Sequence, residues 1–211
     1  MEEFYHNLIT EKSFQTLQDI RKKLDFILIG GWAVFLYTKS LKSKDIDIIV
    51  DFNVLEKIRL KFDLKKNERL KKYEIKIENT DIDIYVPFFS ELGLPVEAIK
   101  SSVVSLEGFN VPSIEALLLL KLFAYSERKG TLKGKKDIID IFSLLQTRSI
   151  NWQEYKGIVK KYNFKAQSKE LESILKTQRQ VKELGLLSHK FSQLKKEVLE
   201  GLSTGSFDKQ T

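Results

Sequence analysis

The stretch that decides the fold of this chain runs from Ile29-Gly30-Gly31 to Asp45-Ile46-Asp47-Ile48. Apolar residues lead into the Gly-Gly turn, and a helix-like segment then carries the chain to a second strand. Side chains alternate between the two faces of a strand, so Asp45 and Asp47 point the same way while the two isoleucines point into the core. The sequence therefore predicts two strands joined by one helix, with two carboxylates on one face.

The carboxylates and the glycines suit two different tasks in the same reaction, metal binding and phosphate binding. Two neighbouring carboxylates repel each other unless a cation lies between them, and their hard oxygen ligands suit Mg²⁺, with Mn²⁺ as a substitute. Glycines let backbone N–H groups approach a phosphate closely. Either motif alone is also typical of an ordinary exposed strand or turn, but a metal-binding carboxylate pair beside a phosphate-accepting turn is what nucleotidyl transfer requires.

The spacing of the two motifs resembles that of the DNA polymerase β-like nucleotidyltransferase superfamily. Its members have an apolar residue, Gly-Gly or Gly-Ser, a spacer of about this length, and then Asp-x-Asp or Asp-x-Glu. The resemblance implies that Gly30 and Gly31 cradle the phosphates of a nucleoside triphosphate (NTP) while Asp45 and Asp47 bind Mg²⁺. It also implies in-line attack of an acceptor hydroxyl on the α-phosphate, with release of pyrophosphate.

A third acid is expected on a neighbouring strand, where it would help to hold the metal and accept the proton of the attacking hydroxyl. Residues 81–86 alternate like a strand, and Asp81 and Asp83 share one of its faces, so periodicity does not choose between them. In the superfamily the third acid is usually flanked by apolar residues. The resemblance therefore favours Asp83, which lies between Ile82 and Ile84.

The order of the expected elements predicts an α/β (α+β) fold in two domains. Residues 1–112 alternate between helix and strand and form the predicted catalytic domain with a small mixed sheet. Its expected elements are a helix at 12–24, a strand at 26–29, a helix at 32–37, a strand at 45–50, a helix at 54–62, strands at 73–78 and 81–86, and a hairpin at 102–106 and 109–111. Residues 113–211 form a predicted helical domain, with helices at 114–124, from about 137, at 151–162, at 166–184 and at 186–200.

The helical half carries a second resemblance, to the abortive-infection (AbiEii-like) nucleotidyltransferases. Lys121-Leu122-Phe123-Ala124, then Arg128, then Lys136-Asp137-Ile138-Ile139-Asp140-Ile141 resembles their Lys-x-x-Ala, Arg and Lys-Asp-x-x-Asp-Leu signature. Ser43-Lys44-Asp45 resembles their Thr/Ser-x-Asp approach to the first carboxylate. The best-known members are toxins of toxin–antitoxin pairs, and some add nucleotides to the acceptor end of tRNA.

The cations of this second signature suit contact with a triphosphate. Lys121, Arg128 and Lys136 can each neutralise phosphate oxygens that gain charge during transfer, and Ser43 is expected to join them in binding the nucleotide. The aspartates of the signature have a different expected role. Asp137 and Asp140 either form an ion-pair network that orients the cations or act in some other way, with metal ligation disfavoured.

Charge and composition narrow the class of protein further. The 211 residues contain no cysteine, which excludes disulfides and thiol nucleophiles. Residues 1–112 hold 17 Lys and Arg against 18 Asp and Glu, a net charge of −1, whereas residues 113–211 hold 19 against 11, a net charge of +8. A basic domain beside a metal-dependent transferase suggests RNA as the acceptor, although lysine-rich solvated helices are common.

No uninterrupted apolar run approaches the roughly 18 residues of a membrane span, and the first residues lack a secretion-signal layout, so we expect a cytoplasmic protein. The function that fits best is transfer of a nucleoside monophosphate to the 3′ end of tRNA, with a cognate antitoxin as a partner. Two alternatives remain. The acceptor could be a protein side-chain hydroxyl, as in minimal transferase antitoxins, or the fold could be a degenerate nucleotide-binding module.

Overall fold

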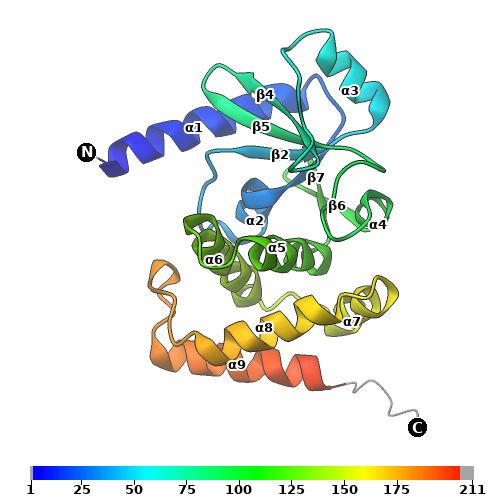
Figure 1. Ribbon diagram of the computed structural model, residues 1–211. Coiled ribbons are helices and arrows are strands. Elements are labelled where there is room, and N and C mark those ends of the chain that lie inside the picture. The colour runs from blue at the N-terminus through cyan, green and yellow to red at the C-terminus, as the bar shows by residue number, and fades with distance from the viewer. Residues whose placement is uncertain (1, 205–211) are drawn as a thin grey trace. The chain divides into compact units, whose positions relative to one another are not determined.

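The computed structural model describes residues 2–204, and the chain divides into two compact units, Met1–Ser113 and Ile114–Thr211. The boundary falls beside the junction expected after Pro112. In the described part of the chain, every strand belongs to the first unit, whereas the second is built from helices (Figure 1).

One mixed sheet of seven strands, in the order β3-β4-β5-β2-β1-β7-β6, forms the first unit. The strands are β1 (Ile27–Ile29), β2 (Ile46–Ile49), β3 (Lys65–Asn67), β4 (Lys72–Ile77), β5 (Thr80–Tyr85), β6 (Val103–Leu106) and β7 (Phe109–Pro112). The helices of this unit are α1 (Glu2–Arg21), α2 (Gly30–Thr38), α3 (Phe52–Arg59) and α4 (Val96–Lys100). Strand β1 pairs in parallel with β7, and β2 with β5, while the other pairs are antiparallel.

The alternation along β2 and β5 separates an apolar face of the sheet from a polar one. Ile46 and Ile48 are buried, and their partners across the parallel pair, Ile82 and Ile84, are buried as well. The residues between these isoleucines therefore project from the opposite face. This is the two-residue period that the sequence predicted, and it places the aspartates of both strands on one side of the sheet.

Two hydrogen bonds tie the long helix α1 to the elements around the Gly-Gly turn. The buried indole of Trp32 in α2 donates to Ser13 Oγ of α1 at 2.9 Å, and Thr16 Oγ1 of α1 lies 3.4 Å from Thr80 Oγ1 of β5. The ribbon of α1 passes the β4–β5 hairpin (Figure 1). Because α2 begins at Gly30, these contacts fix the position of the glycine turn relative to the sheet.

The second unit contains the helices α5 (Ile114–Arg128), α6 (Leu132–Gln146), α7 (Trp152–Lys161), α8 (Lys165–Thr177) and α9 (Ser188–Ser203), with a short 3₁₀ turn η1 (Lys182–Leu184). Ile141 and Phe142 of α6 are fully buried, and the Phe142 ring packs against Phe191 of α9 with centroids 5.1 Å apart. No helix among the described residues combines the length and apolar character needed to cross a membrane.

The structure corrects three of the expected elements. The helix expected at 12–24 is α1, which runs from Glu2 to Arg21. Helix α6 begins at Leu132 instead of near Asp137, because Thr131 caps it by accepting a hydrogen bond from the Gly134 N–H at 3.1 Å. The single helix expected at 166–184 ends at Thr177, after which η1 and a bridge between Val181 and Leu186 turn the chain. Strand β3 and helix α4 were not predicted, and the mixed α/β fold itself is confirmed.

Candidate functional site

Gly30 lies directly against the second aspartate of the Asp-Ile-Asp motif. It has φ +69° at the start of α2, a backbone conformation that favours glycine. A Cβ atom on Gly30 would lie 2.6 Å from Cγ of Asp47 and 2.8 Å from its Cβ, both closer than a real Cβ contact allows. The Gly-Gly turn and the carboxylate strand are therefore in contact, and glycine at position 30 is required both by conformation and by space.

The N-terminus of α2 opens beside this carboxylate. Gly30 and Gly31 are its first two residues, and the preceding Ile29 provides no side-chain cap. The first N–H groups of a helix have no partner within the helix, so they can donate to a ligand, and the helix dipole favours an anion there. Ile29 pairs with Asp47 across β1 and β2, which brings these N–H groups to the edge of the carboxylate strand.

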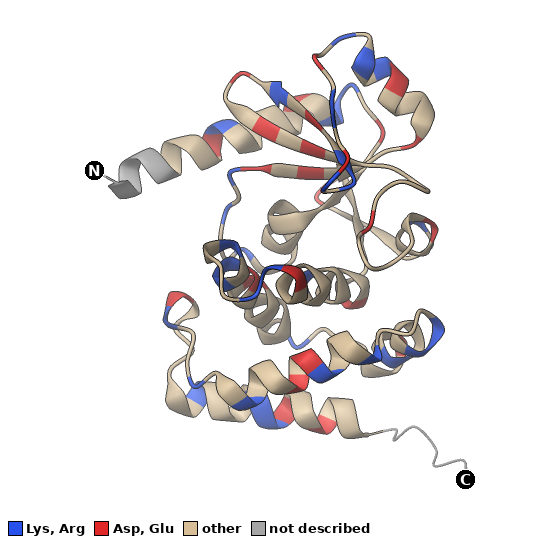
Figure 2. Ribbon diagram, in the orientation of Figure 1, with Lys and Arg blue, Asp and Glu red and all other residues tan. Residues whose placement is uncertain are grey.

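Asp47 and Asp83 are direct neighbours across the parallel pair of β2 and β5. Asp47 is half-buried and Asp83 keeps only 20% of its side chain exposed. The hydroxyl of Tyr85, two residues along β5 on the same face, donates to Asp47 Oδ1 at 3.4 Å. Acidic segments on β2 and on the β4–β5 hairpin are visible in Figure 2. The second acid of the motif and the predicted third acid are thus brought together.

Asp83 is held by a lysine that the sequence analysis did not single out. Lys72 Nζ of β4 donates to Asp83 Oδ2 at 2.6 Å and lies 3.0 Å from Oε1 of Glu74. Asn67 Nδ2 of β3 donates to the same Glu74 oxygen at 3.0 Å. The polar face of the sheet therefore carries a connected network over three neighbouring strands, from Asn67 to Asp83, and Asp47 lies next to Asp83 on the fourth.

The neighbouring charges are close enough to change the protonation of Asp83. Burial, and then the negative charge of Asp47, raise the pKa of Asp83 to about 6, against the opposing influence of Lys72. For Lys72, burial favours a lower pKa, but the hydrogen bond with Asp83 and the charges of Asp83 and Glu74 outweigh it and raise the pKa. One cation thus faces several carboxylates, and their mutual repulsion is only partly offset.

Asp81 differs from Asp83 in both exposure and partners. Its side chain is 63% exposed and pairs with Lys76 at 3.5 Å at the outer end of the β4–β5 hairpin. Asp83 is more deeply buried and lies beside Asp47. This difference supports Asp83 as the third carboxylate, and its role in catalysis stays a prediction.

Asp45, the first acid of the motif, does not form a cluster with Asp47 and Asp83. Asp45 is exposed and precedes β2, while Ser43 is buried in the segment leading to it. Within residues 2–204, no three Asp, Glu, His or Cys side chains lie close enough together to hold a metal ion. The carboxylate oxygens of Asp47 and Asp83 are ligands of the kind that Mg²⁺ takes, so the donor chemistry fits, but the ammonium of Lys72 lies on Asp83.

In the second unit, the predicted cations form an ion-pair network. Arg128 donates two hydrogen bonds to Asp137, from Nε to Oδ2 at 2.6 Å and from Nη2 to Oδ1 at 2.7 Å. Lys121 Nζ lies 2.7 Å from Asp140 Oδ2 and 3.7 Å from Asp137 Oδ1. Lys121 is 8% exposed and both aspartates 1%, so these three side chains are buried, whereas the side chain of Arg128 is 39% exposed. Lys136 lies on α6, half-buried, immediately before Asp137.

The strand register of the β4–β5 hairpin is the feature that could have identified Lys72 and Glu74 as site residues. In the β4–β5 hairpin Glu74 pairs with Asp83, and Lys72 is two residues before it on the same face. The turn at Glu78, which has φ +52°, sets this register. A sequence analysis that fixed the hairpin turn would have placed Glu74 directly opposite Asp83 and Lys72 on the same face.

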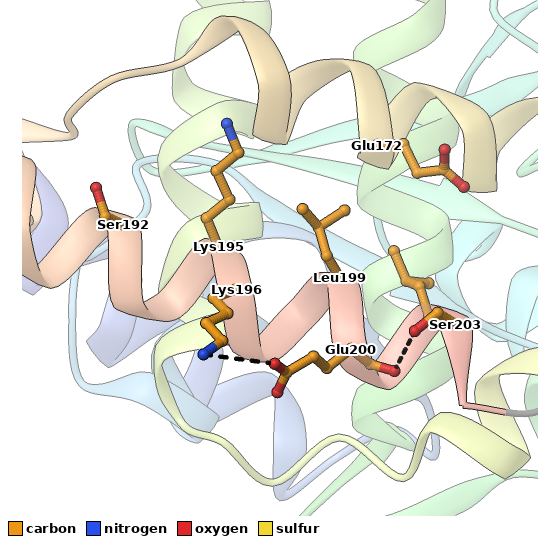
Figure 3. A pocket seen from close by; sticks show the side chains of 8 residues that line it. Glu172, Ser192, Lys195, Lys196, Leu199, Glu200 and Ser203 are labelled. Atoms are coloured by element: carbon orange, nitrogen blue, oxygen red, sulfur yellow. Dashed lines mark hydrogen bonds and ion pairs between the residues drawn. The ribbon is translucent and has the colours of Figure 1, made fainter.

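A hollow of about 650 Å³ lies along α8 and α9 (Figure 3) and is separate from both clusters. It is lined by Glu172, Ser192, Lys195, Lys196, Leu199, Glu200, Leu202 and Ser203. Lys196 lies 3.9 Å from Glu200, and Ser203 Oγ donates to the Glu200 carbonyl at 3.0 Å. None of the predicted site residues lines it, so this hollow is not the candidate active site.

Comparison with solved structures identifies the fold. An H. pylori protein assigned as a nucleotidyltransferase matches with a TM-score of 0.54 and 15% identity, over 93% of this chain and 96% of that one. ANT(2'')-Ia, solved in complex with adenylyl-2''-tobramycin, has a TM-score of 0.52 and 12% identity, over 76% and 99%. JHP933 from Helicobacter pylori has a TM-score of 0.52 and 16% identity, over 98% and 95%.

No protein-family model and no curated protein matches the chain. At these low identities the solved structures show the fold alone. The chain therefore has a nucleotidyltransferase fold, as the resemblance to the polymerase β-like superfamily implied.

Proposed function

We propose that this protein is a metal-dependent nucleotidyltransferase that moves a nucleoside monophosphate from an NTP to an acceptor hydroxyl. The observation that carries the proposal is the contact of Gly30 with Asp47, which in turn lies beside Asp83 on the neighbouring strand. The N-terminus of α2 and a carboxylate pair thus lie together at the central strands β1, β2 and β5 of the sheet. The nucleotidyltransferase fold of the chain supports the same reaction.

Each group has a distinct task in this reaction. The N–H groups at Gly30 and Gly31 bind the terminal phosphates of the NTP. Asp45, Asp47 and Asp83 would hold Mg²⁺, which when bound neutralises charge on the entering and leaving oxygens. The acceptor oxygen attacks the α-phosphorus, the bond between this phosphorus and the α–β bridging oxygen breaks, and pyrophosphate leaves.

To Asp83 we assign acceptance of the proton that the acceptor hydroxyl loses. In the metal-free protein, burial and the charge of Asp47 raise the pKa of Asp83 to about 6, so it is still ionised at neutral pH. Before the metal binds, Lys72 holds this carboxylate through a hydrogen bond of 2.6 Å.

We assign the triphosphate contacts of the second unit to Lys121, Arg128 and Lys136, with Ser43 from the first unit. Asp137 and Asp140 hold Lys121 and Arg128 in place through their ion pairs, so these aspartates orient cations and need no metal. A cation that is already fixed loses less conformational entropy when it binds a phosphate.

For the acceptor we propose RNA, and specifically the 3′ end of tRNA, in a cytoplasmic AbiEii-like toxin with a cognate antitoxin. Residues 113–211 carry a net charge of +8, which favours a polyanionic partner. The resemblance of the Lys121 to Ile141 segment to the AbiEii-like signature supports the same choice.

The test is transfer of label from each of the four α-labelled NTPs, with Mg²⁺ or Mn²⁺, in the presence of total RNA and cell protein. We expect label in RNA of tRNA size with the wild-type protein and none with Asp47→Asn. Label confined to a protein band, or to a small-molecule hydroxyl compound, would contradict the RNA acceptor but keep the reaction. No label with any nucleotide and metal would favour a degenerate binding module.

A further inference from the structure

Lys72 differs from the other lysines of its hairpin. Its side chain is 12% exposed, whereas that of Lys76 on the same strand is 59% exposed. Lys72 contacts two carboxylates, Asp83 at 2.6 Å and Glu74 at 3.0 Å. Most lysines keep their ammonium group in water. The two neighbouring carboxylates compensate Lys72 for the hydration that it loses on burial.

The two partners of Lys72 are direct neighbours across β4 and β5, but they differ in how close they lie to the proposed reaction site. Asp83 of β5 borders Asp47 of β2, and so faces the proposed reaction site. Glu74 of β4 lies away from it and is fixed by Asn67 of β3. Lys72 can therefore leave Asp83 while keeping Glu74, so that its charge stays paired.

We propose that the ammonium of Lys72 occupies the position beside Asp83 that a divalent cation takes, and that metal binding displaces Lys72 onto Glu74. The inference rests on the proposed function, in which Asp83 holds the metal together with Asp45 and Asp47. An ammonium in contact with a carboxylate oxygen disfavours a second cation at that carboxylate, because the two positive charges repel each other at such distances.

In the metal-free protein, Lys72 is in direct contact with the carboxylate of Asp83. Without a metal, Lys72 offsets part of the repulsion between Asp47 and Asp83 and keeps the face folded. The metal must compete with Lys72, so it binds weakly alone and more tightly when phosphate oxygens of the nucleotide add ligands. Lys72 thereby couples metal binding to nucleotide binding.

The test is binding of Mn²⁺ alone, without nucleotide, measured by titration calorimetry or by the paramagnetic resonance signal of free Mn²⁺. We expect Lys72→Met to bind Mn²⁺ about tenfold more tightly than the wild type, because a positive charge has been removed from the site. The matched control is Lys76→Met, which removes an ion pair from the same strand. Its Mn²⁺ affinity should stay within about twofold of the wild type. Equal or weaker Mn²⁺ binding by Lys72→Met would overturn the inference.

A second measurement guards against poor folding of the first variant. Lys72→Gln keeps a hydrogen-bond donor for both carboxylates but has no charge. In EDTA it should melt below the wild type, since Asp83 loses its ion pair, and added Mn²⁺ should raise its melting temperature by more than it raises that of the wild type. A Mn²⁺-dependent rise no larger than that of the wild type would contradict the inference.

A double variant tests whether the tighter Mn²⁺ binding of Lys72→Met arises at Asp83. Adding Asp83→Asn to Lys72→Met should remove the tighter Mn²⁺ binding, and its retention would place the metal elsewhere and overturn the inference. None of these readouts depends on turnover. A protein that transfers no nucleotide but gains Mn²⁺ affinity with Lys72→Met would contradict the proposed function alone. An active transferase whose Mn²⁺ affinity is unchanged by Lys72→Met would contradict this inference alone.

Discussion

The two ionic clusters of the molecule differ in charge balance. Between α5 and α6, Lys121 and Arg128 face two aspartates, so cations and carboxylates are equal in number. On the polar face of the sheet, Lys72 alone faces Asp83 and Glu74, with Asp47 adjacent. A balanced buried network needs no further ion, whereas an unbalanced one has a place for a cation. This difference supports our proposals that metal binds at the sheet and that the helical ion pairs orient fixed cations.

The largest expected effect separates the two aspartates of β5. Asp83→Asn should lower turnover about 100- to 1000-fold, because it removes the proposed proton acceptor and a metal ligand. Asp81→Asn, at an exposed position on the same strand face, should change it by less than about threefold. The measurement is the steady-state rate of nucleotide transfer once the acceptor is known. A crippled Asp81→Asn beside an active Asp83→Asn would reverse the assignment.

A substitution in the ion-pair network of α5 and α6 should instead lower the stability of the protein. Asp137→Asn leaves Arg128 and Lys121 without their shared buried anion and should lower the free energy of unfolding by about 3 kcal/mol, with or without metal. Urea denaturation in EDTA and in Mg²⁺ checks this. Glu170→Gln, which breaks the exposed pair with Lys129 in the same unit, is the control and should change little. A loss of stability seen only with Mg²⁺ would mean that Asp137 binds metal.

A smaller effect is expected in the pH dependence of the metal-free protein. The pKa of Asp83 is raised to about 6 in the folded state, above the ordinary value of 3.8, so between these pH values the folded protein holds this proton more tightly than the unfolded one. Its contribution to stability is fully present below about pH 4 and is lost as the pH rises through about 6.

The stability of the wild type relative to Asp83→Asn should therefore fall by about 2 kcal/mol from pH 4 to pH 7 in EDTA, since asparagine does not titrate. Denaturation at a series of pH values measures the difference. Parallel pH profiles for the two proteins would show that the pKa of Asp83 is not raised in the folded protein.

Local periodicity was enough to predict most of the sheet. The alternating apolar residues predicted the strands that carry Asp47 and Asp83, and the turn at Gly108 predicted the β6–β7 hairpin. Strand β3 was missed because Lys65-Lys66-Asn67 has no apolar alternation, and α4 because it has only five residues. Short elements of this kind are fixed by their neighbours more than by their own sequence.

The candidate site was predictable only where one local motif carries it. Gly30 and Asp47 follow from their spacing along the chain, and the structure adds that they touch. Lys72 could not be found in the same way, because its role depends on the antiparallel register of β4 against β5. The pairing of Arg128 with Asp137 likewise depends on α6 starting at Leu132, earlier than its sequence suggested.

The most direct test of the central claim is metal-dependent nucleotide binding by the double variant Asp45→Asn, Asp47→Asn. With Mg²⁺ and an NTP, the wild-type protein should melt at a higher temperature, because the ligand binds the folded state selectively. In the double variant this rise should vanish, while its circular dichroism spectrum matches that of the wild type. An undiminished rise in the double variant would show that metal and nucleotide bind elsewhere, and would contradict the account.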